Sequence, residues 1–201
     1  MAIACEGEVD RAVLCRVLEL RDVAIGTIRV AGGVARLESR MAGYLAAARL
    51  APWIVHRDLD SAAACAPALL ARIAPARISG LNLIIPVRQT EAWLLADRDG
   101  CAKFLGVRPS AMPDEPETLA DAKQALVRLA GRSRRRDIRD GIVPSATSGR
   151  KVGPEYVARV SGFVATGWSP DRAVAGGARS LAKLLERIER FRRTGSWARA
   201  G

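Results

Sequence analysis

MAIACEGEVD (residues 1–10) and PWIVHRDLD (residues 52–60) share one pattern, in which a short apolar run is followed at once by acidic residues. Each apolar run is typical of a buried strand, so we expect strands at residues 2–5 and 53–56. Open α/β sheets bind their ligands beyond the carboxyl ends of such strands. The two stretches therefore predict acidic side chains gathered at one edge of a sheet.

The first half of the chain continues with alternating elements. Apolar patterns predict further strands at 25–30 and 81–87, and helices at 10–21, 34–50, 63–73 and 91–96. Helices between successive strands are the usual connection of parallel neighbours. We therefore predict an α/β fold with a mostly parallel sheet and flanking helices.

The pattern changes after Gly106. Three prolines fall within residues 107–118, which predicts a linker or a long loop. Helical spacing then returns near 119–130, 155–163 and 179–191. The expected organisation is an α/β domain at 1–106, a linker at 107–118 and a basic helical C-terminal subdomain at 119–201.

Positive charge is concentrated late in the chain. The formal net charge is +11, and residues 126–201 hold 17 Lys and Arg against 6 Asp and Glu, whereas residues 1–125 hold 15 of each. The densest basic patch comprises Arg132, Arg134, Arg135, Arg136, Arg139, Arg150 and Lys151. Such a patch favours binding to the phosphates of DNA or RNA, although a solvated arginine-rich surface is the plainer alternative.

The acidic residues predict a divalent-cation site. Glu6 follows the first strand, and Asp58 and Asp60 follow the third. Mg²⁺ prefers oxygen ligands and needs only a few carboxylates together with substrate phosphate. The alternative is structural, because Asp58 or Asp60 could cap the next helix, and Glu8 and Asp10 suit a first helical turn.

At this point the residues resemble a known family. An apolar strand ending in Glu-Gly, followed about fifty residues later by one ending in Asp-x-Asp, is similar to the toprim domain of topoisomerases, DnaG-type primases and overcoming-lysogenization-defect nucleases. The stretch RQTEAWLLAD (residues 88–97) further resembles compact toprim-like proteins encoded beside AAA-type ATPases in phage-defence neighbourhoods.

The resemblance implies roles for individual residues. It makes Glu6 a general acid/base or metal ligand, and it makes Asp58 and Asp60 ligands of Mg²⁺ or Mn²⁺, so that these three are the catalytic set. Asp10 and Glu91 would be secondary acids that complete a second metal site. One metal ion and two ions both remain open. An AAA-type ATPase partner is implied in the same way.

These observations predict a metal-dependent nuclease acting on DNA or RNA, with a defence or toxin-like role implied by the resemblance. Two alternatives stay open: a non-catalytic docking subunit of an ATPase complex, and a phosphohydrolase of small molecules. His56, the only histidine, would either donate to a phosphate or pack in the core. With no signal peptide and no apolar run of roughly 20 residues, we expect a cytoplasmic protein without a membrane span. Monomer and homodimer both remain open.

Overall fold

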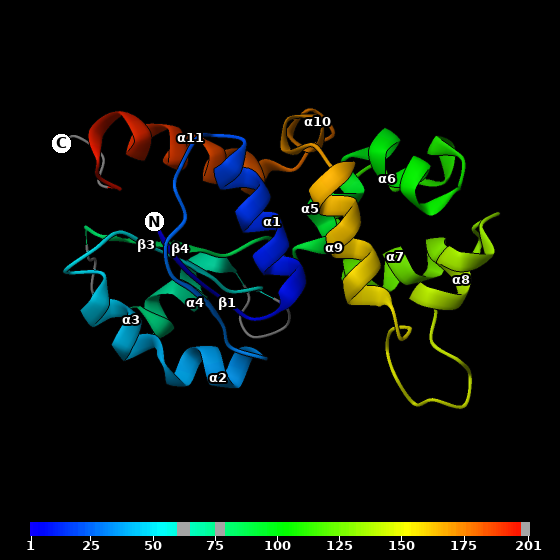
Figure 1. The fold of residues 1–201 in the computed structure, drawn as a ribbon, viewed down its shortest axis with the longest axis horizontal. Coiled ribbons are helices and arrows are strands. Elements are labelled where there is room, and N and C mark those ends of the chain that lie inside the picture. The colour runs from blue at the N-terminus through cyan, green and yellow to red at the C-terminus, as the bar shows by residue number, and fades with distance from the viewer. Residues whose placement is uncertain (60–64, 75–78, 198–201) are drawn as a thin grey trace. The chain divides into compact units, whose positions relative to one another are not determined.

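The computed structural model describes residues 1–59, 65–74 and 79–197, and the first part of the chain forms a four-stranded parallel sheet (Figure 1). The strand order is β2-β1-β3-β4. The strands are β1 (Ala2–Cys5), β2 (Ile28–Val30), β3 (Trp53–His56) and β4 (Leu81–Ile84). All three neighbouring pairs run parallel, which confirms the predicted α/β class.

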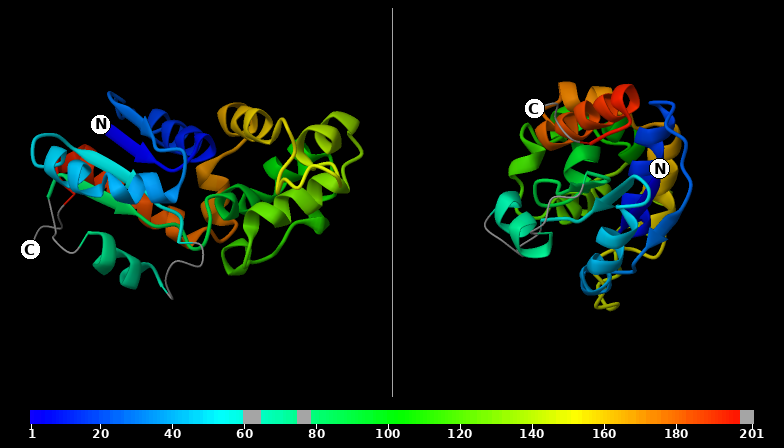
Figure 2. Two further views of the ribbon diagram at one scale, coloured as in Figure 1. Left: turned by 90° about the horizontal axis from the view of Figure 1, so that it is seen from below. Right: turned by 90° about the vertical axis from the view of Figure 1, so that its left-hand side faces the viewer.

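The chain leaves the two central strands in opposite directions. After β1 it passes through α1 (Glu8–Glu19) to β2 on one side, and after β3 it passes through α4 (Ala66–Ile73) to β4 on the other. α1 and the later α11 (Arg179–Thr194) cover one face of the sheet (Figures 1 and 2). The opposite face is covered by α4 together with α2 (Val34–Ser39) and α3 (Met41–Ala47).

Strand side chains alternate between these two faces, as the pleat of a strand requires. Ala4, Val55 and Leu83 belong to a core cluster with Leu37 of α2 and Tyr44 of α3. Their neighbours in sequence consequently point to the other face. This alternation places the side chain of His56, the last residue of β3, on the α1 face.

The helix expected over residues 34–50 is interrupted. α2 ends at Ser39 and α3 begins at Met41, with Arg40 at φ −97° and ψ 0° between them. Apolar periodicity continues across this break because Leu37, Met41 and Tyr44 are all buried. The sequence pattern therefore indicates that both helices face the same core, but it does not indicate that the helix is interrupted between them.

The chain divides into two compact units. Unit 1 is Met1–Val87 with Ala182–Gly201, and unit 2 is Arg88–Leu181. This division differs from the expected boundary at 107–118. Residues 88–106 belong to the same unit as the later helices, and most of α11 belongs to the sheet unit.

Unit 2 is helical and is built around α5 (Glu91–Ala96), all six residues of which are buried. The remaining α-helices are α6 (Arg98–Leu105), α7 (Ala122–Gly131), α8 (Arg136–Ile142), α9 (Tyr156–Thr166) and α10 (Pro170–Ala175). The expected linker contains two 3-10 helices, η1 (Pro109–Ala111) and η2 (Pro116–Thr118). Trp93 of α5 donates from Nε1 to Ser180 Oγ at 2.7 Å, and its carbonyl accepts from Trp168 Nε1 at 3.2 Å.

The charge excess is shared between the units. Unit 1 holds 16 Lys and Arg against 10 Asp and Glu, and unit 2 holds 16 against 11. The concentration of charge late in the sequence is therefore not a concentration in one unit, because six of the late basic residues fall within 182–201, which belongs to unit 1. Within the described residues, no helix is both long enough and apolar enough to cross a membrane.

The buried carboxylate of Asp97 forms hydrogen bonds to three segments of unit 2. Asp97 is fully buried, and its oxygens accept from Arg172 Nε at 2.7 Å, Arg172 Nη2 at 2.8 Å and Ser169 N at 2.9 Å. It also caps α6 by accepting from Gly100 N. Removing the carboxylate would leave the backbone N–H groups of Ser169 and Gly100 without this acceptor, whereas Arg172 Nη2 would keep its bond to Gly167 O at 2.7 Å.

We expect Asp97→Ala to lower the free energy of unfolding by about 2–4 kcal/mol, because two partly buried backbone donors and a charged partner lose a buried acceptor. Asp114→Ala is the matched control: Asp114 pairs with Arg98 on the surface, where a pair is worth about 0–1 kcal/mol. Chemical denaturation of both variants measures the difference. Equal losses in the two variants would contradict a fastening role for Asp97.

Candidate metal site

The candidate site lies beyond the carboxyl ends of β1 and β3. These neighbouring strands are the pair from which the chain departs in opposite directions, first to β2 and then to β4. Such a switch point leaves a crevice between the outgoing connections, and open α/β sheets bind ligands there. The topology therefore selects this edge of unit 1 before any side chain is considered.

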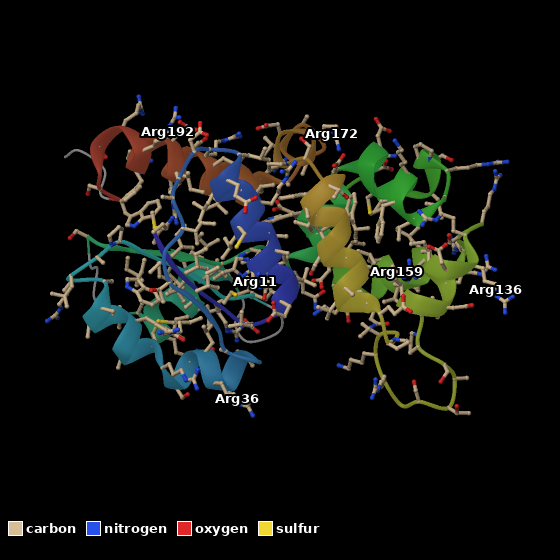
Figure 3. All side chains as sticks on the ribbon, viewed as in Figure 1. Arg11, Arg36, Arg136, Arg159, Arg172 and Arg192 are labelled. Atoms are coloured by element: carbon tan, nitrogen blue, oxygen red, sulfur yellow. The ribbon has the colours of Figure 1, made fainter. Side chains whose placement is uncertain are left out.

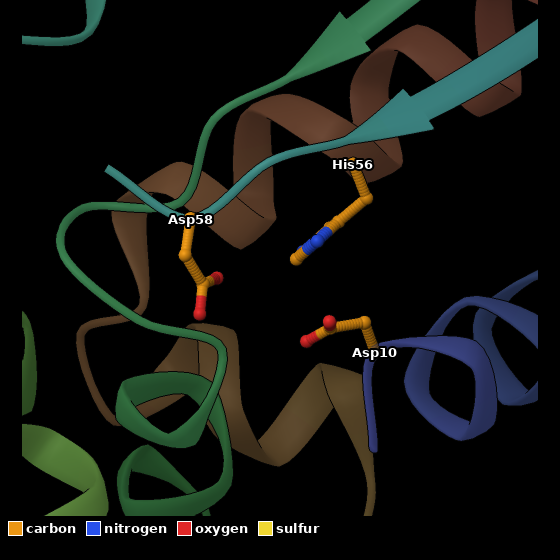
Figure 4. A group of neighbouring side chains, drawn as sticks. All are labelled: Asp10, His56 and Asp58. Atoms are coloured by element: carbon orange, nitrogen blue, oxygen red, sulfur yellow. The ribbon is translucent and has the colours of Figure 1, made fainter. Parts of the chain in front are cut away.

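Three side chains converge at this edge (Figure 4). Asp10, His56 and Asp58 each offer a ligand atom, and these atoms all lie within 4.8 Å of one another. Asp10 and Asp58 are 7% exposed, and His56 is fully buried. Figure 4 shows the two carboxylates and the imidazole pointing toward one another from α1, from β3 and from the segment after β3.

Asp10 is held by the start of α1. Gly7 is the N-cap of the helix, and its backbone N–H donates to Asp10 Oδ2 at 2.9 Å. The positive end of the helix dipole favours a carboxylate at this position. The expected helical-turn role of Asp10 is thus present, and the same side chain also faces His56 and Asp58.

His56 is shielded from water. Burial lowers the pKa of its imidazole, and the nearby charge of Asp10 acts weakly in the opposite direction. The lowered pKa favours the neutral imidazole, the form that carries a free lone pair for a metal ion. A neutral histidine beside two acids is a suitable mixed donor set.

Asp58 is positioned by Glu6. The backbone N–H of Asp58 donates to Glu6 Oε1 at 3.0 Å, and Arg57 Nη1 lies 3.4 Å from the same oxygen. The Arg57 guanidinium also donates from Nε to Glu38 Oε1 at 3.0 Å and contacts the backbone carbonyl of Asp58. Glu6 thus ties the segment after β3 to the end of β1.

The Glu6 backbone also orders the turn after β2. Its carbonyl accepts from Gly32 N at 2.9 Å and from Gly33 N at 3.0 Å. Both glycines have positive φ, 75° and 126°, which other residues rarely adopt. Glu6 therefore connects three segments at the edge of the sheet, and the group of candidate metal ligands does not include it.

The donor set fits a divalent ion. Ligand atoms that each lie about 2.0–2.2 Å from one ion are separated by at most about 4.4 Å, and the ligand atoms of this group all lie within 4.8 Å of one another. Two carboxylates in such proximity repel each other, and a cation between them offsets the repulsion. An imidazole ligand favours Mn²⁺, Fe²⁺ or Zn²⁺ over Mg²⁺, which prefers oxygen donors alone.

The structure does not bring Glu91 into this group, and Asp60 falls outside the described residues. Glu91 belongs to unit 2, where its Oε1 accepts from Tyr156 Oη at 2.8 Å and pairs with Lys123 Nζ at 3.3 Å. Glu8 is exposed and pairs with Arg11, as expected for an acid in a first helical turn.

His56 is the candidate ligand whose role the sequence left open. Its signal was its place as the last residue of an apolar strand, at the same sheet edge as the acids. Cys5, at the end of β1, is not part of the candidate group, and burial raises the pKa of its thiol well above the ordinary value.

The predicted basic patch splits into paired and unpaired side chains. Arg135 bonds to Asp137, and Arg136 pairs with Asp140 at 3.2 Å. Arg139 donates from Nη1 to Ser133 O at 2.5 Å. In the part of the chain that the structure describes, four side chains of the patch form no hydrogen bond or ion pair: Arg132, Arg134, Arg150 and Lys151. Arg136 projects outward from α8 (Figure 3).

We expect the full chain to bind Mn²⁺ or Zn²⁺ and to unfold at a higher temperature when the ion is added, because a ligand that binds only the folded state stabilises it. His56→Ala and Asp58→Asn should each weaken the binding by at least about tenfold. Glu8→Gln is the matched control, since it removes an exposed acid near the start of the same helix. Calorimetric titration measures the affinity, and unchanged affinity in His56→Ala would contradict the site.

The ion pairs around Arg57 predict an acid dependence of stability. Burial alone would raise the pKa of Glu38, but hydrogen bonds from Arg72 and Arg57 lower it below its usual value. A folded-state pKa below the unfolded value stabilises the protein above the unfolded pKa, and this contribution is lost as pH falls through the folded pKa.

Glu38→Gln should therefore lower the free energy of unfolding at neutral pH, and its difference from the natural chain should shrink toward about pH 3. Glu19→Gln, at an exposed position of α1, is the control and should track the natural chain. Urea denaturation across this pH range provides the test. A constant difference at every pH would refute the assignment.

A comparison of the chain with protein-family models gives no match, and comparisons with curated proteins and with solved structures give none either. The toprim resemblance accordingly stays a prediction from the residues. What the structure itself provides is a parallel α/β unit with a buried Asp10–His56–Asp58 group that could hold a metal ion at its switch point.

Proposed function

We propose that this protein is a metal-dependent phosphodiesterase that cleaves DNA or RNA. The observation that carries the proposal is the convergence of Asp10, His56 and Asp58 at the switch point of the sheet. The net charge of +11 supports a polyanionic substrate. The pattern resembling toprim domains points to the same chemistry.

The chain's own residues would act by charge and position. Asp10 and Asp58 supply two negative charges for a divalent ion, and His56 supplies a neutral nitrogen. When bound there, such an ion would polarise a phosphodiester oxygen and lower the pKa of a water that attacks phosphorus. Mn²⁺ suits this mixed donor set better than Mg²⁺ does.

Glu6 would be a positioning residue in this scheme. Its carboxylate holds the Asp58 backbone and meets Arg57, so its effect would reach the ion through Asp58. Groups that orient metal ligands typically change activity or affinity by about 10–100-fold when removed. This assignment differs from the acid/base role that the family resemblance implies.

The wider role follows only from the resemblance. Similar toprim-like proteins encoded beside AAA-type ATPases would make this chain a defence or toxin-like effector controlled by such a partner. Under that proposal, the nuclease activity of the lone chain would be weak until the ATPase is present.

The test is cleavage of labelled single- and double-stranded DNA and RNA with Mn²⁺, Mg²⁺ or Zn²⁺. We expect Mn²⁺-dependent cleavage that Asp58→Asn lowers roughly 100-fold or more, the scale observed when one transition-state stabiliser is removed. Glu8→Gln should retain the natural rate. Glu6→Gln should fall between the two, with weaker metal binding accounting for its loss.

Equal cleavage by Asp58→Asn and the natural chain would identify a contaminating nuclease and overturn the proposal. Absence of cleavage by the natural chain under all three ions would also overturn it. Salt-sensitive binding without cleavage would then favour the docking-subunit alternative.

A further inference from the structure

Unit 2 contains a pocket of about 590 Å³ that the metal site does not use. It lies where the end of α7, the second half of α8 and the segment 143–154 come together. Residues important for its chemistry are Arg139, Asp140, Ser145, Ser148 and Arg150. The volume is sufficient for a phosphate group together with part of the attached sugar.

The segment 143–154 forms a loop whose base is closed. Gly153 N donates to Ile142 O at 2.8 Å, and Glu155 N donates to Gly141 O at 2.9 Å. A Cβ on Gly153 would lie only 2.5 Å from Gly141 O, so this approach requires glycine. Gln124 of α7 also donates to Lys151 O at 2.8 Å. The loop is thus anchored at its base and at Lys151.

Two arginines bring positive charge to the pocket. Arg139 is fixed by its contact with Ser133 O through Nη1, and its other guanidinium N–H groups are not engaged in that bond. Arg150 is exposed, and among the described residues its guanidinium forms no ion pair or side-chain hydrogen bond. Its backbone N–H donates to Ser148 Oγ at 3.3 Å, which orders the residue.

The acid in the lining is already paired. Asp140 meets Arg136 Nε at 3.2 Å, so its charge is compensated from outside the pocket lining. Two guanidinium groups therefore remain to attract an anion. Arginine presents several planar N–H donors that match the oxygens of a phosphate.

We propose that this pocket binds a backbone phosphate of a nucleic acid strand, with Arg150 as the principal contact and Arg139 as the second. The inference rests on the proposed nucleic-acid substrate, and it singles out two members of the broad basic patch. Arg135 and Arg136 are occupied by acids of α8 and contribute less. Because phosphate contacts carry no base information, the pocket would grip the strand without reading its sequence.

The experiment measures binding of a fluorescent single-stranded oligonucleotide to the full chain in EDTA, so that no metal-dependent step contributes. Arg150→Ala should weaken binding by about tenfold at low salt and lower the slope of log affinity against log salt by about 1. Arg108→Ala is the matched control, since it removes an equally exposed arginine of unit 2 outside the pocket. It should change the affinity less than about twofold.

Equal losses of affinity in the two variants would overturn the pocket and indicate a diffuse charge effect. Unchanged affinity in both variants would also overturn it. A second arm adds inorganic phosphate or a nucleoside monophosphate as competitor. Displacement of the oligonucleotide only at millimolar competitor supports a strand phosphate. Tight monophosphate binding that Arg150→Ala abolishes, with oligonucleotide binding unchanged, would assign the pocket to a small ligand and overturn the proposal.

The two proposals fail in different ways. Cleavage that persists in Arg150→Ala with unchanged strand affinity would refute the pocket and leave the phosphodiesterase standing. If strand binding depends on Arg150 but the natural chain cleaves no substrate with any of the three metal ions, the phosphodiesterase is refuted and the pocket stands.

Discussion

The opposite departure of the chain from β1 and β3 is the constraint on which the site depends. It opens the crevice between two adjacent parallel strands, and every candidate ligand comes from a segment that borders it. Asp10 enters from the helix after β1, and His56 and Asp58 come from the end of β3 and just beyond. Without the reversal, a connecting helix would cover this edge and exclude a ligand.

A second set of interactions holds that edge in shape. The guanidinium of Arg57 is 3% exposed and lies between the carboxylates of Glu6 and Glu38. A buried charge with a single lost partner is costly, so the three groups constrain one another. Glu6 also accepts a hydrogen bond from the Asp58 backbone, so the ion pairs of Arg57 are connected to a candidate metal ligand. We therefore interpret Glu6 and Gly7 as residues that support the candidate site, and Asp10 as one of its candidate ligands.

Much of the sheet unit could be predicted from the sequence because its signals are local. The apolar run at Trp53–His56 matches β3 residue for residue, and the run at Ala2–Cys5 matches β1. The break at Arg40 and the return of α11 to the sheet depend on tertiary packing, which periodicity does not report. His56 was ambiguous for the same reason, since burial beside two acids is a property of the fold. The acids after each strand were predictable. Which of them face the candidate metal position and which only hold the backbone in place was not.

The return of α11 also makes unit 2 an insertion within unit 1. β4 ends at Ile84, and the next contribution to the sheet unit begins at Ala182. Within unit 1, Arg187 of α11 donates to Asn82 Oδ1 at 3.1 Å and covers strand β4. During synthesis, at about 5–20 residues per second, all four strands leave the ribosome several seconds before this helix is made. For that interval α1 alone covers its face of the sheet, and the apolar surface that α11 later covers stays open to chaperones that bind exposed apolar segments.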